Sequence, residues 1–182
     1  MIEEVVKALK KLDVILYPTD TVWGIGCDAT SEEAVKKVYK LKKREESKSL
    51  IILVDSIEML KEYVDDIPQK AIHILREREN PTTIIYNKPK KLASNTIAKD
   101  NTIAIRIVQN EFCQNLIKQF GKPIVSTSAN ISGEPTPKSF LEISKAILNN
   151  VDYVVNLYQN KESVKSSTIL KIDGEDVIVI RE

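Results

Sequence analysis

The chain is poor in the residues that build metal and redox sites. It has a single histidine, His73, and two cysteines, Cys27 and Cys113, which lie far apart and form no CxxC pair. One histidine excludes every site that needs two, and with it most zinc enzymes. Two separate cysteines indicate free thiols in a reducing compartment rather than a disulfide framework.

Long apolar stretches are also missing. The longest uninterrupted apolar run, Leu50–Val54, has five residues, far fewer than the about 20 that a membrane-spanning helix needs. The first ten residues mix acidic with apolar side chains and contain no apolar signal-peptide core. We therefore expect a cytoplasmic protein that does not associate with a membrane.

An excess of charge of either sign is absent as well. The 27 lysines and arginines against 26 aspartates and glutamates give a net charge of +1. A uniformly basic nucleic-acid surface is therefore excluded, although a local basic patch is not. With 182 residues, of which 42% are hydrophobic, the chain is long enough for one domain with its own core.

Helix and strand patterns alternate along the chain. Apolar residues at three- and four-residue spacing predict helices, and short apolar runs bounded by turn residues predict strands. The predicted helices span residues 2–11, 31–43, 57–64, 68–79, 111–120 and 138–149. The predicted strands span residues 14–17, 50–54, 83–86, 102–108, 124–125, 153–155, 167–172 and 177–180. This interleaving predicts an α/β fold with a twisted, open, mixed sheet and flanking helices.

The segment YPTDTVWGIGCD, residues 17–28, runs from a buried strand into hydroxyls, a carboxylate and two glycines. Hydroxyls at the end of a strand can face a ligand, and glycine permits close approach of the backbone. A capped turn between a strand and a helix explains the same residues equally well. The glycine pair is not a dinucleotide fingerprint, because the third glycine is missing.

Residues 36–48, KKVYKLKKREESK, carry seven basic and two acidic side chains. A charge run is most often a solvated helix face, which suits Lys36 and Lys40. Lys42, Arg44 and Lys48 fall at the helix end and in the following loop, where fixed cations can neutralise a polyphosphate.

Two further features indicate a polar pocket. The segment STSANISG, residues 126–133, follows a strand and is rich in hydroxyl and amide groups that can bind phosphate oxygens. Alone it also fits an ordinary serine-rich turn. Arg106 lies within an apolar strand, on the face opposite Ile105 and Ile107, where a charge usually pairs or faces a cavity.

Taken in order, these segments resemble the YrdC/Sua5 family, the threonylcarbamoyl-AMP synthases. The YPTDTVWGIGCDA and STSANISG strings are the most specific parts of the match. Weaker support comes from Lys42-Lys43-Arg44 with Lys48-Ser49-Leu50, from Pro81-Thr82-Thr83, from the Arg106 strand, and from Ser167-Thr168-Ile169 with Ile180-Arg181. The resemblance covers Tyr17 to Arg181. It implies a YrdC-like domain over residues 1–182 around a large basic cavity, without the C-terminal domain of the long Sua5 form.

The sequence departs from the family pattern in three places. Arg78-Glu79-Asn80 stands where the family usually has Trp-Pro-Gly, and Val108 stands where a proline commonly follows. Ser49 replaces the proline of a Lys-Pro-Leu element. These changes affect loops near the expected cavity.

The resemblance implies a nucleotidyltransferase that converts L-threonine, bicarbonate and ATP into threonylcarbamoyl-AMP and pyrophosphate. The product feeds formation of N6-threonylcarbamoyladenosine at position 37 of tRNA. Mg²⁺ is expected to accompany ATP, with no metal ligand assigned to a side chain. Proteins that transfer the threonylcarbamoyl group are expected downstream partners, and contact with tRNA or double-stranded RNA is a further expectation.

The resemblance also assigns the site residues one by one. The expected catalytic residues are Lys42 and Arg44. The expected ATP-binding residues are Arg44, Lys48, Thr102, Ser128, Asn130, Thr136 and Arg181. The expected threonine-binding residues are Thr21, Arg106, Ser126 and Ser167. No general base is evident, and Asp20 is the one candidate in the first segment.

A second interpretation from a different class is an RNA-binding module that uses the same basic cavity without catalysis. The hydroxyl-rich segment 126–133 and a single arginine on an apolar strand suit a small-molecule pocket better than an extended duplex. A third interpretation, a carbamoyl-transfer domain of a larger maturation protein, is disfavoured by the lack of zinc-ligand cysteine and histidine sets.

Overall fold

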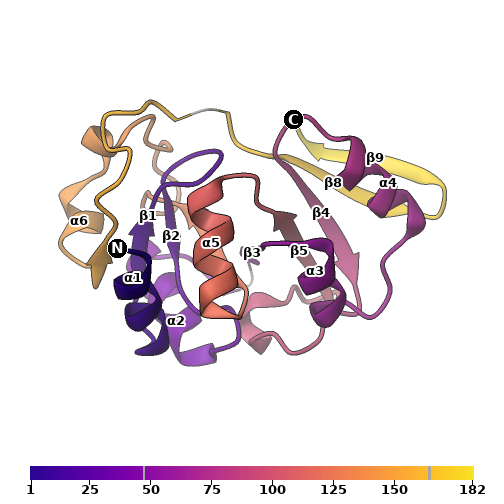
Figure 1. Ribbon diagram of the computed structural model, residues 1–182, viewed down its shortest axis with the longest axis horizontal. Helices are drawn as coiled ribbons and strands as arrows, with labels where there is room; N and C mark the ends of the chain where they lie inside the picture. The colour runs from indigo at the N-terminus through magenta and orange to yellow at the C-terminus, as the bar shows by residue number, and fades with distance from the viewer. Residues whose placement is uncertain (47, 164) are drawn as a thin grey trace.

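The computed structural model describes residues 1–46, 48–163 and 165–182. Within these ranges nine strands form one sheet in the order β7-β1-β2-β6-β3-β5-β4-β8-β9 (Figure 1). The pairs β1/β7, β3/β5 and β4/β8 are parallel and the other pairs are antiparallel, so the predicted mixed sheet is confirmed. The strands are β1 (Ile15–Tyr17), β2 (Gly24–Gly26), β3 (Ile51–Val54), β4 (Thr82–Asn87), β5 (Thr102–Ile107), β6 (Ile124–Ser128), β7 (Tyr153–Val154), β8 (Thr168–Asp173) and β9 (Asp176–Arg181).

The helices begin and end at the signals that the sequence carries. The Ser31 hydroxyl accepts from the Ala34 amide at 3.2 Å, and Gly121 ends a helix at a positive φ of 77°. None of the helices in the described ranges is long and apolar enough to cross a membrane. The helices are α1 (Ile2–Lys10), α2 (Glu32–Lys42), α3 (Ile57–Tyr63), α4 (Gln69–Glu77), α5 (Glu111–Phe120) and α6 (Lys145–Leu148), with 3₁₀ turns η1 (Ser94–Thr96) and η2 (Phe140–Glu142).

The sheet has a core on each face. Successive strand residues point to opposite faces, so Leu53 and Ile52 belong to different cores. Leu53 packs with the apolar faces of α1 and α5, which lie side by side (Figure 1). Ile52 packs in the larger core with buried residues of α2, α3 and α4. The α1/α5 pair covers only part of its face, and Arg106 emerges on that face because it pairs with Leu53.

The sequence interpretation missed β2 and shortened β6. Residues 24–26 were not assigned to a strand, but they form one between β1 and β6. Gly26 is required there by close packing, because a Cβ atom on it would lie 2.5 Å from the Val125 carbonyl oxygen and 2.6 Å from the Tyr17 ring. The β6 strand continues through Ser128, so the first part of the STSAN segment is strand rather than loop.

The predicted helix over residues 138–149 is wrong. The chain forms the 3₁₀ turn η2, an extended residue at Ile143 with φ −68° and ψ 125°, and then the short α6. Ile143 and Ile147 are both buried in the larger core. The burial of Ile143 in an extended conformation interrupts the helix that the local pattern favoured.

Candidate functional site

A cleft of about 170 Å³ opens on the sheet face that α1 and α5 leave uncovered. Its lining contains three guanidinium groups and many hydroxyls, and none of these lining residues carries a carboxylate. Such a set of donors suits an anion, and arginine suits carboxylate and phosphate oxygens in particular. The lining residues are Thr21, Val22, Arg44, Ser49, Leu50, Ile51, Arg106, Ser126, Thr127, Ser128, Thr136, Ser166, Ser167 and Arg181.

Arg106 is held from behind by Asp20. Its Nη2 donates to Asp20 Oδ1 at 3.0 Å, and the two side chains are only 3% and 8% exposed. The other carboxylate oxygen of Asp20 accepts from the Gln109 amide at 3.0 Å. The Nε of Arg106 is buried without an acceptor among the described residues. A buried donor without an acceptor costs about 1–3 kcal/mol, so an anionic ligand would complete this group.

Arg181 on β9 lies across β4 and β8 from Arg106 on β5. Thr83 of β4 pairs with Arg106 on one side and with Ile169 on the other, and Ile169 pairs with Arg181. Arg181 donates through Nε and Nη2 to the Ser167 carbonyl at 3.1 and 2.8 Å. Burial, and then the positive charge of Arg106, lower the pKa of Arg181. The two cations therefore repel, and an anion between them would relieve that repulsion.

Hydroxyls fix the floor between these two arginines. The Ser167 and Thr83 hydroxyls lie 2.8 Å apart, and Arg181 Nη2 also donates to the Ser167 hydroxyl at 3.2 Å. Both serine and threonine are almost fully buried. Thr83 belongs to the Pro81-Thr82-Thr83 element of the family match, but it was not among the predicted site residues.

Arg44 enters the cleft from the loop after α2. Its Nε and Nη2 donate to the carbonyl oxygens of Lys48 and Ser49 at 3.0 and 2.9 Å. Burial lowers the pKa of this arginine. The contacts tie the loop onto the start of β3, which brings Ser49 into the lining. Lys48 itself is exposed and does not line the cleft.

Lys42 is not in the cleft but beneath the 126–133 segment. Its ammonium donates to the carbonyl oxygens of Ser128 at 2.5 Å and Asn130 at 2.6 Å, and its own carbonyl accepts from the Ser132 amide at 2.8 Å. Only 1% of the residue is exposed. Burial, and to a lesser extent the charge of Arg44, lower the pKa of Lys42 to about 8. This placement lets Lys42 hold the segment in position, and the catalytic role that the resemblance implies stays a prediction.

The buried Lys42 predicts a specific pH dependence. Its pKa is about 8 in the folded chain against 10.5 when exposed, so the unfolded chain binds more protons between these pH values. Its contribution to the free energy of unfolding should therefore rise by roughly 3 kcal/mol as pH increases through this window. Urea unfolding of wild type and Lys42→Met across the window measures the difference. A Lys40→Met control should keep the wild-type slope, and a pH-independent difference for Lys42→Met would contradict the placement.

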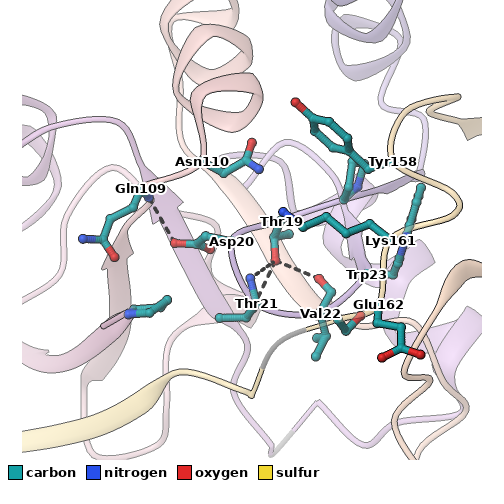
Figure 2. A pocket seen from close by; sticks show the side chains of 13 residues that line it. Thr19, Asp20, Thr21, Val22, Trp23, Gln109, Asn110, Tyr158, Lys161 and Glu162 are labelled. Carbon is teal, nitrogen blue, oxygen red and sulfur yellow. Dashed lines mark hydrogen bonds between the residues drawn. The ribbon is translucent and has the colours of Figure 1, made fainter. Parts of the chain in front are cut away.

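A second hollow of about 290 Å³ lies beside the cleft. Figure 2 shows its wall, the loop from Pro18 to Trp23, with Gln109 and Asn110 at one end and Tyr158, Lys161 and Glu162 at the other. The Thr19 hydroxyl braces this loop, since it donates to the Val22 carbonyl at 2.7 Å and accepts from the Thr21 amide at 3.0 Å. Thr21 and Val22 line both hollows and form the partition between them.

The structure brings together most of the residues that the resemblance assigned. The cleft contains Thr21, Arg44, Arg106, Ser126, Ser128, Thr136, Ser167 and Arg181. Lys42, Lys48, Thr102 and Asn130 lie outside its lining. The Thr102 hydroxyl donates to Asp100 at 2.6 Å, and the Asn130 amide donates to the Ile131 and Glu134 carbonyls. Val22, Ser49 and Ser166 line the cleft without having been predicted, although each adjoins a predicted residue.

A small cleft lined by several guanidinium groups is typical of an α/β protein that binds small anionic ligands. A nucleic-acid-binding protein would instead present a broad basic surface. Comparison with known sequences narrows this class. A family model for Sua5, YciO and YrdC, described as telomere recombination, matches residues 7–182, and the chain belongs to this family.

Named relatives and solved structures agree with this assignment. The chain is 35% identical to the threonylcarbamoyl-AMP synthase of Pseudoalteromonas translucida, over 83% of this chain and 82% of that protein. It is 35% identical to the threonylcarbamoyl-AMP synthase of Photobacterium profundum, over 80% of each. The structure of P. abyssi Sua5 complexed with L-threonine superposes with a TM-score of 0.89 at 25% identity, over 99% of this chain. The match spans only 53% of the length of that Sua5 chain.

Proposed function

We propose that this protein makes threonylcarbamoyl-AMP and pyrophosphate from L-threonine, bicarbonate and ATP, for threonylcarbamoylation of tRNA. Two curated relatives have the name of this synthase, and the chain matches most of the length of each. The observation that carries the proposal within the chain is Arg106, whose buried Nε lacks an acceptor in a cleft shared with Arg44 and Arg181. We further propose that residues 1–182 form the catalytic domain and act in the cytoplasm.

We assign the threonine end of the proposed site to Arg106. Its guanidinium would receive the carboxylate of threonine, the natural acceptor for the free Nε. Thr21 lies 3.4 Å from Arg106 Nη2, and Ser126 and Ser167 line the same cleft. These hydroxyls can bind the hydroxyl and amine of the amino acid. A solved relative bound to L-threonine supports this choice of ligand.

We assign the nucleotide end to Arg44, Arg181, Ser128 and Thr136. The two guanidinium groups line the cleft without filling it, and the hydroxyls can bind phosphate oxygens. Thr102 lies on the same face of β5 as Arg106, four residues away, which is about 13 Å along a strand. An extended triphosphate nucleotide can cover such a distance, so Thr102 stays in the proposal as an outer contact. Lys48 and Asn130 stay in it because the resemblance assigns them.

The chemistry requires charge stabilisation more than covalent catalysis. The neutral amine of threonine adds to the carbon of CO₂ with loss of a proton, or to that of bicarbonate with loss of water, and forms a carbamate. A carbamate oxygen then attacks the α-phosphorus of ATP, and the bond to the leaving pyrophosphate breaks. Negative charge that develops on phosphate oxygens is what Arg44 and Arg181 are placed to stabilise.

The other reactive groups of the chain do not enter this scheme. Burial raises the pKa of the Cys27 and Cys113 thiols, which makes both poor nucleophiles. A proton taken up by Asp20 would remove the charge that pairs with buried Arg106, so Asp20 is unsuited to act as the general base. Substrate and solvent are left as the proton acceptors.

A protein-held magnesium site does not fit the cleft. Its described lining has no carboxylate, and no group of three or more metal-ligating side chains occurs in the described part of the chain. Mg²⁺ prefers carboxylate, phosphate and water oxygens. We therefore propose that Mg²⁺ arrives with ATP, held by phosphate oxygens and water, and we assign it no ligand in the chain.

One assay tests the proposed function. Purified protein with ATP, Mg²⁺, L-threonine and bicarbonate should release pyrophosphate and yield threonylcarbamoyl-AMP, identified by mass spectrometry. Omission of threonine or bicarbonate should abolish both products. Pyrophosphate release that does not depend on threonine would refute the assignment. Tight RNA binding with no product would favour the RNA-binding module instead, and direct tRNA contact and delivery to transfer proteins stay predictions.

Arg44 supplies a second test with a matched control. Replacement of Arg44 by alanine removes a charge-assisted phosphate contact, worth about 1.5–3 kcal/mol, so ATP binding should weaken roughly 10- to 150-fold. Lys36→Ala removes an exposed cation of the same basic segment and should change ATP binding less than about twofold. Isothermal titration with a non-hydrolysable ATP analogue measures both. Equal losses at the two positions would indicate diffuse electrostatics rather than a defined phosphate site.

A further inference from the structure

We propose that Asp20 determines which substrate Arg106 binds: it reserves this arginine for a single carboxylate and keeps polyphosphate on Arg44 and Arg181. The inference rests on the proposed function, because that function places an amino acid and a nucleotide in one cleft. It addresses a problem that the cleft poses, since three guanidinium groups close together would all attract the triphosphate.

The three arginines have different partners. Arg106 forms a buried ion pair with Asp20, with 3.0 Å between Nη2 and Oδ1. Arg44 and Arg181 donate instead to main-chain carbonyls. A carbonyl carries no net charge, so it does not neutralise the guanidinium as a carboxylate does. The Arg106 end of the cleft is therefore close to neutral, and the other end carries two positive charges. A phosphate chain favours the second end, and a single carboxylate suffices at the first.

Asp20 is placed to act through Arg106 rather than on a substrate. Arg106 lines the cleft, whereas Asp20 lines the second hollow behind it. Figure 2 shows Asp20 on the Pro18–Trp23 loop, bonded to the main chain of Gln109. The hydrogen bond from Gln109 holds the Asp20 carboxylate in place. The carboxylate in turn holds the Arg106 guanidinium, whose Nε has no acceptor among the described residues. Asp20 is thus a positioning residue whose charge also sets the anion preference of Arg106.

The Asp20→Asn variant separates these effects from a structural role. An asparagine oxygen can still accept from Arg106, but its amide nitrogen cannot accept from the Gln109 amide, and the negative charge is lost. We expect pyrophosphate to bind about 10-fold more tightly and L-threonine about 10-fold more weakly. Pyrophosphate should also begin to compete with threonine. Isothermal titration of each ligand alone, and of threonine in the presence of pyrophosphate, measures this.

Two matched variants complete the design. Asp20→Glu keeps the charge, so its pyrophosphate affinity should stay within about twofold of wild type while threonine binding weakens through misalignment. Glu162→Gln removes a carboxylate from the rim of the same second hollow, and both affinities should stay at the wild-type level. Circular dichroism and thermal melting establish that each variant is folded. If Asp20→Asn does not fold, the pyrophosphate affinity of Asp20→Glu decides the test. Tighter pyrophosphate binding by Asp20→Glu than by wild type would then overturn the proposal.

The remaining outcomes are also decisive. Weaker binding of both ligands by Asp20→Asn would show a purely structural role and overturn the inference, as would unchanged pyrophosphate affinity. Wild-type protein that binds pyrophosphate but not threonine would refute the proposed function instead. In that case tighter pyrophosphate binding by Asp20→Asn would still support the control of anion preference by Asp20.

Discussion

The Gly26→Ala variant is expected to lose about 3 kcal/mol of its free energy of unfolding, near the upper end of overpacking effects. The added methyl carbon would lie 2.5 Å from the Val125 carbonyl oxygen and 2.6 Å from a carbon of the Tyr17 ring. Neither group can move easily. Val125 is in a central strand, and the Tyr17 hydroxyl is held by a bond to the same Val125 carbonyl at 3.0 Å.

Gly24 provides the control for this experiment, because it lies two residues away in the same strand. A methyl carbon there meets its nearest atoms at 3.3–3.4 Å, which small shifts can accommodate. Gly24→Ala should therefore cost under about 1.5 kcal/mol. Urea unfolding of the two variants and wild type gives the comparison. Equal midpoints for Gly26→Ala and wild type would show that β2 does not pack against Tyr17 as described.

The Arg106→Ala variant is expected to raise the KM for threonine roughly 10- to 150-fold, because a charge-assisted contact to the carboxylate is lost. The KM for ATP should change much less, since the phosphate groups are assigned to Arg44 and Arg181. The variant should also be less stable by about 3–5 kcal/mol, because the buried carboxylate of Asp20 loses its partner. Steady-state kinetics with each substrate varied, below the melting temperature of the variant, measures the two KM values.

Arg181→Ala is the crossed control for this division of the cleft. It should raise the KM for ATP more than that for threonine, the reverse of Arg106→Ala. A mutant at Arg106 whose ATP requirement rises while its threonine requirement stays constant would place Arg106 on the nucleotide side. Such a result would also remove the basis for the role assigned to Asp20.

Much of the fold could be predicted from local patterns. The amphipathic spacing and caps of α2 and α5 are properties of neighbouring residues, and the structure confirms both helices. β2 could not be predicted, because Gly-Ile-Gly has low strand preference and forms a strand only where β1 and β6 lie on either side of it. The helix expected near residue 143 failed for the opposite reason, since the larger core holds Ile143 in an extended conformation.

The sequence by itself determined the chemical groups of the site and the family, because both are carried by short strings such as residues 17–28 and 126–133. Only the tertiary structure decided which groups meet. Arg44, Arg106 and Arg181 are distant in the chain and share one cleft because the order of the strands brings their elements together. The tertiary structure also decided that Lys42 lies under the 126–133 segment and that Asp20 pairs with Arg106. The direction in which a side chain points and the partner that it finds depend on non-local packing and on the burial of charge. The spacing of residues in the sequence contains neither kind of information.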